Sequence, residues 1–130
     1  MENIKGKKIM IVEDDKFFIS LISKKLLDNG LEVLSANDGQ QTFKVLETKK
    51  PDLIILDIML PDIDGFEILK RLKEMPIVKD IPVIFLTNLG TKEDIVKGRS
   101  LGVSSFLIKA TVTMDEVIQE ISRTLGGKKI

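Results

Sequence analysis

The sequence predicts an α/β protein with a three-layer, doubly wound (βα)5 architecture, in which one parallel sheet of five strands carries helices on both faces. Short runs of branched apolar residues occur five times, and such runs are typical of strands buried on both faces. Longer segments with the apolar period of a helix lie between them, and this alternation is typical of a parallel sheet. We expect residues 1–130 to form a single domain with a core at about 7–125, because no linker or low-complexity segment divides the chain.

The first strand and helix have the clearest boundaries. The expected strand Lys8–Glu13 is an apolar run that ends in an acid, and the expected helix Asp15–Asn29 places its apolar residues on one face. Asp15 is a favourable N-cap residue, and Gly30 can adopt the left-handed conformation that commonly ends a helix. This pair therefore predicts the first βα unit.

The second and third units follow the same pattern. Strands are expected at Glu32–Ala36 and Leu53–Ile58, and the helices after them at Asp38–Thr48 and Gly65–Met75. Both helices repeat apolar residues at a spacing that gives each one a face able to pack on the sheet. Two aspartates just before the third helix indicate turn and cap chemistry. These aspartates are Asp62 and Asp64.

The last two units complete the alternation. Strands are expected at Pro82–Thr87 and Ser105–Lys109, and helices at Lys92–Leu101 and Thr113–Leu125. The last helix begins with Thr and has Glu three residues later, which is the spacing of a capping box. Gly98 lies inside the fourth helix, where it weakens the helix and can ease its movement, unless it allows close packing against a neighbour.

Composition excludes several classes of function. The 20 basic and 20 acidic residues give a formal net charge of zero, so we expect no direct binding to nucleic acid or to a membrane surface. The chain has no Cys and no His, which excludes disulfides, thiol catalysis and Ser-His-Asp triads and makes a zinc site unexpected. The apolar stretch after the basic start is too short for a signal peptide or a membrane span, and we expect a cytoplasmic protein.

Four of the five expected strands end in residues that can serve one shared site. Glu13 and Asp14 close the first strand, and Asp57 closes the third. Thr87 closes the fourth strand and Lys109 the fifth. Parallel strands share one carboxyl edge, where open α/β sheets bind their ligands. The three carboxylates can share a cation only if the first and third strands are neighbours, which requires the flavodoxin-like strand order 2-1-3-4-5.

The residue types at this edge predict phosphoryl-transfer chemistry. Clustered carboxylates repel one another unless a cation or a proton intervenes, and Mg²⁺ prefers oxygen ligands of this kind. The ammonium of Lys109 and the hydroxyl of Thr87 can bind the oxygens of a phosphoryl group. Asp57 is best placed among these groups, so we expect its carboxylate to be the nucleophile that forms an aspartyl phosphate.

Four segments carry a family resemblance, namely Ile9–Asp15, Leu53–Gly65, Val83–Thr87 and Phe106–Lys109. Together, in this order and along nearly the whole chain, they resemble the receiver domain of bacterial two-component response regulators. The resemblance implies that Asp57 accepts a phosphoryl group from a sensor histidine kinase or a His-phosphotransfer protein. It implies a signalling protein and not an enzyme, apart from catalysis of its own phosphorylation and dephosphorylation.

The resemblance also implies a metal site. Asp14 would bind Mg²⁺ directly, and Glu13 would bind it through water. Asp57 and the backbone carbonyl of Met59 would complete the ligands from the protein. Mn²⁺ is the alternative ion.

The resemblance further implies a conformational switch. Phosphorylation adds charge that Thr87 and Lys109 can bind, and movement of Thr87 would leave space for Phe106 to rotate inward. The face made by the fourth helix, the fifth strand and the fifth helix would then change shape and bind a downstream protein. A homodimer that forms on phosphorylation is left open, and so are the identities of the kinase and the target.

Some positions depart from the family pattern. The family has Pro after the lysine, in a cis peptide, whereas this chain has Ala110. A non-proline cis bond costs roughly 2.5–4 kcal/mol, and we expect the site to stabilise that bond nonetheless. Met59 and Leu89 are apolar where the family's side chains flank the path of hydrolytic water, which predicts a slow loss of the phosphoryl group.

Three other functions compete with the receiver. The first is a phosphorylation-independent interaction domain, a pseudo-receiver, which only Ala110 favours. The second is an Asp-nucleophile phosphatase of the haloacid dehalogenase type, which needs a general acid where this chain has Met59. The third is a flavin- or nucleotide-binding module, which needs Gly, Ser or Thr after the first strand, where this chain has acids that repel phosphate.

Overall fold

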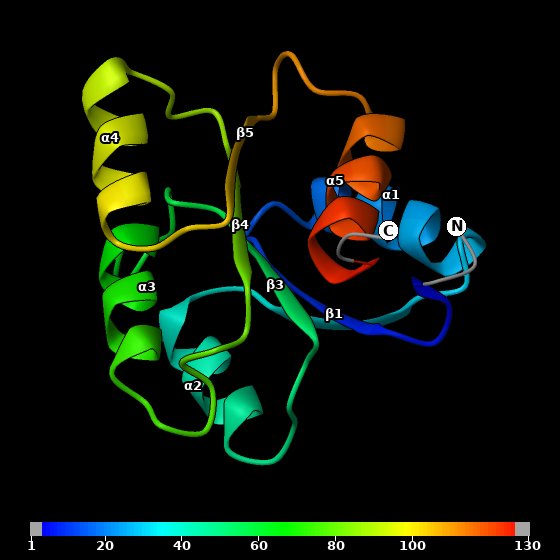
Figure 1. Cartoon of the computed structure of the whole chain (residues 1–130), viewed down its shortest axis with the longest axis horizontal. Coiled ribbons are helices and arrows are strands. Elements are labelled where there is room, and N and C mark those ends of the chain that lie inside the picture. The colour runs from blue at the N-terminus through cyan, green and yellow to red at the C-terminus, as the bar shows by residue number, and fades with distance from the viewer. Residues whose placement is uncertain (1–3, 127–130) are drawn as a thin grey trace.

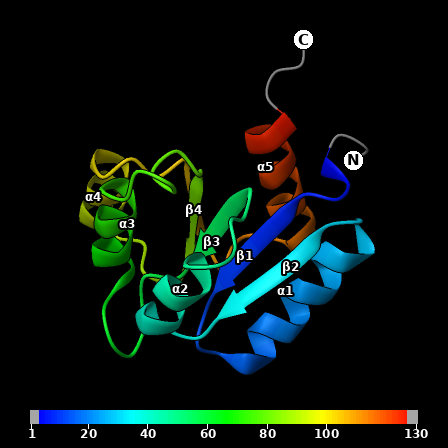
Figure 2. The same ribbon diagram turned by 90° about the horizontal axis from the view of Figure 1, so that it is seen from below.

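Five parallel strands and five helices alternate along residues 4–126, which the computed structural model describes (Figure 1). The strands are β1 (Lys8–Val12), β2 (Glu32–Ala36), β3 (Leu53–Leu56), β4 (Val83–Thr87) and β5 (Ser105–Ile108). The helices are α1 (Lys16–Asp28), α2 (Gly39–Leu46), α3 (Gly65–Lys73), α4 (Lys92–Ser100) and α5 (Met114–Gly126). The strand order in the sheet is β2-β1-β3-β4-β5, which confirms the predicted order. Figures 1 and 2 show α1 and α5 on one face of the sheet and the other three helices on the opposite face.

The sheet separates two hydrophobic layers. Along β1, Met10 and Val12 pack in the layer beneath α2 and α3, whereas Ile9 and Ile11 pack in the layer beneath α1 and α5. The residues of β3 and β4 alternate between the two layers in the same way. Each fully buried Ile or Leu contributes roughly 1.5–3 kcal/mol to folding, so a central strand without polar residues is stabilised on both faces. Within the described residues, no helix is both long and apolar enough to cross a membrane.

The predicted helix caps at both ends of the chain are confirmed. The side chain of Asp15 accepts hydrogen bonds from the N–H groups of the second and third residues of α1, at 3.0 and 3.2 Å. Gly30 follows that helix with a φ of 81°, a left-handed conformation that favours glycine. At α5, Thr113 and Glu116 exchange hydrogen bonds of 3.0 and 2.8 Å between side chain and backbone, which completes the capping box.

The two aspartates before α3 cap different helices. Asp64 is the N-cap of α3, as expected of a cap residue, and its side chain accepts from the N–H of Glu67 at 2.9 Å. The carboxylate of Asp62 instead accepts from the N–H groups of Gly39 and Gln40 at the start of α2, at 2.9 Å each. The loop between β3 and α3 is therefore tied to a helix that precedes it by more than 20 residues.

Gly98 of α4 serves close packing, which is the second of the two roles considered for it. The residue is buried, and a Cβ atom placed on it would lie 3.1 Å from ring atoms of both Phe85 and Phe106. These two rings pack edge to face with their centroids 5.5 Å apart. The missing side chain thus lets α4 approach the aromatic residues of β4 and β5 closely.

Candidate functional site

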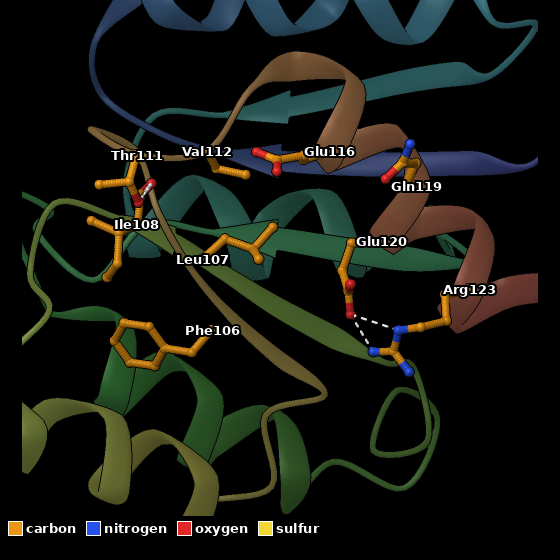
Figure 3. A pocket seen from close by; sticks show the side chains of 9 residues that line it. All are labelled: Phe106, Leu107, Ile108, Thr111, Val112, Glu116, Gln119, Glu120 and Arg123. Atoms are coloured by element: carbon orange, nitrogen blue, oxygen red, sulfur yellow. Dashed lines mark hydrogen bonds and ion pairs between the residues drawn. The ribbon is translucent and has the colours of Figure 1, made fainter.

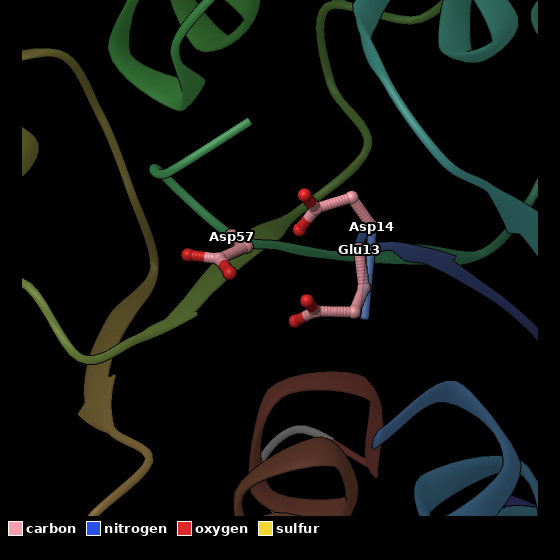
Figure 4. Close-up of side chains that lie close together, drawn as sticks. All are labelled: Glu13, Asp14 and Asp57. Atoms are coloured by element: carbon pink, nitrogen blue, oxygen red, sulfur yellow. The ribbon is translucent and has the colours of Figure 1, made fainter. Parts of the chain in front are cut away.

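Three carboxylates meet at the carboxyl ends of β1 and β3. These strands are paired neighbours, with Val12 opposite Leu56, so the residues that follow each strand lie side by side. Oxygen atoms of Glu13, Asp14 and Asp57 all lie within 4.8 Å of one another (Figure 4). Glu13 and Asp57 are buried, whereas Asp14 is exposed, so the cluster has one side open to solvent.

Lys109 neutralises part of this negative charge. Its Nζ atom lies 2.9 Å from Oδ2 of Asp57 and also forms an ion pair with Oε1 of Glu13. The lysine side chain is only 14% exposed, so this contact is shielded from water and screened less than a surface ion pair. The structure therefore joins Lys109 to two residues that lie 52 and 96 positions away in the sequence.

The expectation of a cis peptide bond after Lys109 was wrong. Every peptide bond among residues 4–126 is trans, the Lys109–Ala110 bond included. Without proline the trans form is favoured by several kcal/mol. Two backbone hydrogen bonds hold the turn that follows β5. The N–H of Lys109 donates to the carbonyl of Thr87 at 2.9 Å, and the N–H of Val112 donates to the carbonyl of Ile108 at 3.0 Å. The lysine reaches Asp57 on this trans backbone.

The electrostatics of the cluster suit a divalent cation. Burial raises the pKa of Glu13, and the nearby charge of Asp57 also raises it, although bonds from Lys109 and Asp15 oppose both effects. Burial alone would lower the pKa of Lys109, but its bonds to Glu13 and Asp57 outweigh this and raise the pKa. Three carboxylates against one ammonium leave an excess of two negative charges when all are ionised. An all-oxygen donor set with this excess fits Mg²⁺ or Mn²⁺.

Asp57 is held at both of its carboxylate oxygens. Oδ2 contacts Lys109, and Oδ1 accepts a 3.1 Å hydrogen bond from the N–H of Met59. This bond folds the loop after β3 back toward the carboxylate, so the backbone of Met59 lies next to the cluster. Met59 is 56% exposed, and its apolar side chain offers the site no hydrogen-bond donor.

The two predicted switch residues lie in different surroundings, Thr87 at the end of β4 and Phe106 on β5. Thr87 is fully buried at the end of β4, and its Oγ1 accepts a 3.2 Å bond from the N–H of Leu89, which leaves the hydroxyl hydrogen available for donation. Among the residues that the structure describes, Lys109 and not Thr87 is hydrogen bonded to Asp57. The ring of Phe106 packs on Phe85, away from the carboxylates.

Sequence reasoning missed one neighbour of the lysine. The Nζ atom of Lys109 lies 4.5 Å from the centroid of the Phe18 ring, which is within cation–π range. Phe18 falls on the apolar face of α1, so its spacing indicated only a core residue. No sequence signal gives the direction of its ring.

The chain is similar to known proteins along most of its length. The family model described as the response regulator receiver domain matches residues 9–122. The alkaline phosphatase synthesis transcriptional regulatory protein PhoP of Bacillus subtilis is 38% identical over 104 residues, which cover 80% of this chain. That match covers 42% of PhoP, so the chain spans less than half the length of this curated relative.

Two solved structures share the fold and more than a quarter of the sequence. The phosphorylated cyanobacterial phytochrome response regulator RcpA has a TM-score of 0.82 at 30% identity, with 96% of this chain and 97% of that chain covered. The Mn²⁺-bound form of the response regulator Rcp1 has a TM-score of 0.81 at 29% identity, with 95% and 98% covered.

Proposed function

The chain belongs to the response regulator receiver family, and we propose that Asp57 is its phosphoryl acceptor. As a receiver domain it serves signalling, and receiver domains interact with histidine kinases and downstream effectors. One observation carries the proposal: three carboxylates lie within 4.8 Å of one another while the Lys109 ammonium lies 2.9 Å from Asp57. All the residues that the proposal requires are present in the chain, so a phosphorylation-independent pseudo-receiver is not favoured.

In the proposed reaction, a carboxylate oxygen of Asp57 attacks the phosphorus of a phosphohistidine on a sensor kinase or a His-phosphotransfer protein. A P–O bond forms, the P–N bond breaks, and the electron pair of that bond returns to the histidine nitrogen. Glu13, Asp14, Asp57 and the carbonyl of Met59 would hold the cation. Bound Mg²⁺ would neutralise the carboxylates and the phosphoryl oxygens.

The other side chains of the site would then bind the product. The ammonium of Lys109 is already at Asp57 and would pair with a phosphoryl oxygen. The Thr87 hydroxyl would donate to a second oxygen, and its movement would let Phe106 shift. The chain would in this way catalyse its own phosphorylation. Attack of water on the acyl phosphate would release inorganic phosphate and restore the carboxylate of Asp57.

The proposed output surface is the face of α4, β5 and α5. A pocket of about 530 Å³ lies between β5 and α5 on this face, with Phe106 at one end and the ion pair of Glu120 and Arg123 at the other (Figure 3). Such a mixture of apolar and charged groups suits a downstream protein, or a second copy of the chain after phosphorylation. The proposal places the chain in the cytoplasm and assigns it no direct contact with nucleic acid.

Phosphorylation by a small donor tests the proposal. Incubation with acetyl phosphate and Mg²⁺ is expected to add the mass of one phosphoryl group, as measured on the intact protein. Asp57→Asn should abolish the added mass, and chelation of the metal should prevent it. Asp80→Asn, a change at an exposed carboxylate outside the cluster, is the matched control and should react normally. Absence of the added mass in the unsubstituted protein, or its presence in Asp57→Asn, would overturn the assignment.

A further inference from the structure

The ammonium of Lys109 is enclosed by three groups, and only two of them are charged. Glu13 and Asp57 pair with it, and the ring of Phe18 lies 4.5 Å from the nitrogen. A cation over an aromatic face within about 6 Å of the centroid is attracted by the ring quadrupole, most strongly where water is excluded. The 14% exposure of the lysine side chain meets that condition.

The first turn of α1 fixes the position of this ring. Oδ1 of Asp15 accepts from the N–H groups of both Phe17 and Phe18, which anchors the turn directly after the acidic pair. Phe18 then packs against the apolar layer beneath α1 and α5. Its neighbour Phe17 is 78% exposed, so two adjacent rings on one helix have different surroundings.

We infer that Phe18 is a positioning residue for phosphoryl transfer, and that it acts through Lys109. The inference rests on the proposed function. A cation held at Glu13 would compete with the ammonium for that carboxylate, and Lys109 would then keep Asp57 and the ring as its partners. The ring is not a ligand for a metal ion, so its contact with the ammonium would persist when the metal binds and would hold Lys109 toward Asp57. It also keeps water from the ammonium, and this strengthens the attraction of Lys109 for phosphoryl oxygens.

Three variants separate this role from simple packing. Phe18→Leu keeps apolar volume but removes the aromatic face, Phe18→Tyr keeps the face, and Phe17→Leu removes the exposed ring beside it. The first readout is the NMR shift of the Lys109 ε-protons, recorded without any phosphoryl donor. A ring-current shift is expected in the unsubstituted protein, in Phe18→Tyr and in Phe17→Leu, and its loss is expected in Phe18→Leu.

The second readout is the rate of phosphorylation by phosphoramidate at saturating Mg²⁺. Phe18→Leu should react about fivefold more slowly, which corresponds to roughly 1 kcal/mol of cation–π attraction. Phe18→Tyr should restore the rate, and Phe17→Leu should not change it. Phe18→Met, which also lacks a ring, replaces the leucine variant if that variant does not fold.

The outcomes distinguish this inference from the proposed function. An unsubstituted protein that takes no phosphoryl group would contradict the proposed function, while the NMR readout would still test the contact. A normal rate in Phe18→Leu, or an equal loss of rate in Phe18→Tyr, would overturn the positioning role. So would an ε-proton shift that survives removal of the ring.

Discussion

At the scale of single residues, the site depends on two buried carboxylates that share one ammonium. Glu13 and Asp57 are 3% and 5% exposed, and buried carboxylates are costly unless they are paired or neutralised. Lys109 is the partner that makes their burial tolerable, and its raised pKa keeps it charged at neutral pH. Because one lysine binds both residues, a rotation of either carboxylate also disturbs the contact of the other.

Two apolar residues occupy the positions that we expect to flank the path of hydrolytic water, and they predict a long-lived phosphoryl group. Met59 and Leu89 each lie two positions beyond a site residue, and neither can orient a water molecule by a side-chain hydrogen bond. Met59→Asn combined with Leu89→Glu should quicken phosphate loss about tenfold, the effect of one new hydrogen bond of roughly 1.4 kcal/mol. The decay is followed by intact mass after removal of the donor.

A conservative pair provides the control for this change. Met59→Leu combined with Leu89→Met keeps both positions apolar and should leave the decay rate as it is in the unsubstituted protein. Decay that is unchanged or slower in the Asn and Glu double variant would refute the expected role of these two positions.

At the scale of elements, Asp62 links the site loop to α2. It accepts two N–H groups at the start of that helix, and Asp38 accepts a third from Gln41 at 2.8 Å. Desolvation raises the pKa of Asp62, but hydrogen bonds from backbone N–H groups outweigh it and hold the pKa below its ordinary value. The ionised carboxylate therefore stabilises both the start of α2 and the loop that carries Met59.

Asp62→Ala should lower the free energy of unfolding at pH 7 by about 1 kcal/mol, as loss of a helix cap does. Because the folded pKa is depressed, the contribution is fully present above the unfolded pKa of about 3.8. It is lost as the pH falls through the lower folded value. Urea unfolding at a series of pH values should thus show the difference from the unsubstituted protein shrinking below about pH 4.

Asp80→Ala, which removes an exposed carboxylate elsewhere, controls for the change in net charge. A deficit in Asp62→Ala that stays constant as the pH falls would show that the carboxylate charge is not its cause. Equal stability of the two variants at pH 7 would contradict the claim that Asp62 stabilises the start of α2.

Element boundaries were predictable to within about two residues, because they depend on local signals. Apolar period and cap residues such as Asp15 and Thr113 act over a few positions, so the sequence marks them directly. The bonds of Asp62 to α2 join residues 22 and 23 positions apart, and no local rule selects that partner. The direction of the Phe18 ring likewise depends on packing between α1 and the end of β5.

At the scale of the whole molecule, the carboxylate cluster was predictable from the sequence alone. Parallel strands share one edge, so residues at the ends of distant strands lie at the same side of the sheet. Three carboxylates there can share a cation only if the first and third strands are neighbours. The trans bond at Ala110 agrees with the intrinsic preference of a non-proline peptide, whereas the expectation of a cis bond came from a family pattern that depends on proline. The family pattern of a cis bond did not apply to this chain, which has Ala110 in place of proline.

Cation binding should stabilise the entire domain, because the cluster joins β1 to β3 at the centre of the sheet. Mg²⁺ at about 100 times its Kd is expected to add roughly 2.7 kcal/mol to the free energy of unfolding and to raise Tm. Asp14→Asn removes an exposed carboxylate of the cluster and should lose most of this gain. Thermal unfolding with and without Mg²⁺, at constant ionic strength, measures the effect.

The same variant without Mg²⁺ supplies the control. Asp14→Asn should then be at least as stable as the unsubstituted protein, because one of three repelling charges is gone. An equal Mg²⁺-induced rise in Tm in both proteins would show that the cation binds elsewhere.

The contact between Gly98 and the two aromatic rings constrains how this sequence can diverge. A methyl group at position 98 would lie 3.1 Å from atoms of Phe85 and Phe106, so a larger residue is tolerated only if a ring gives way. In an alignment of close homologues, residue volumes at positions 98 and 106 should therefore vary inversely. Substitution would proceed there as a compensated pair, and either change alone would be selected against.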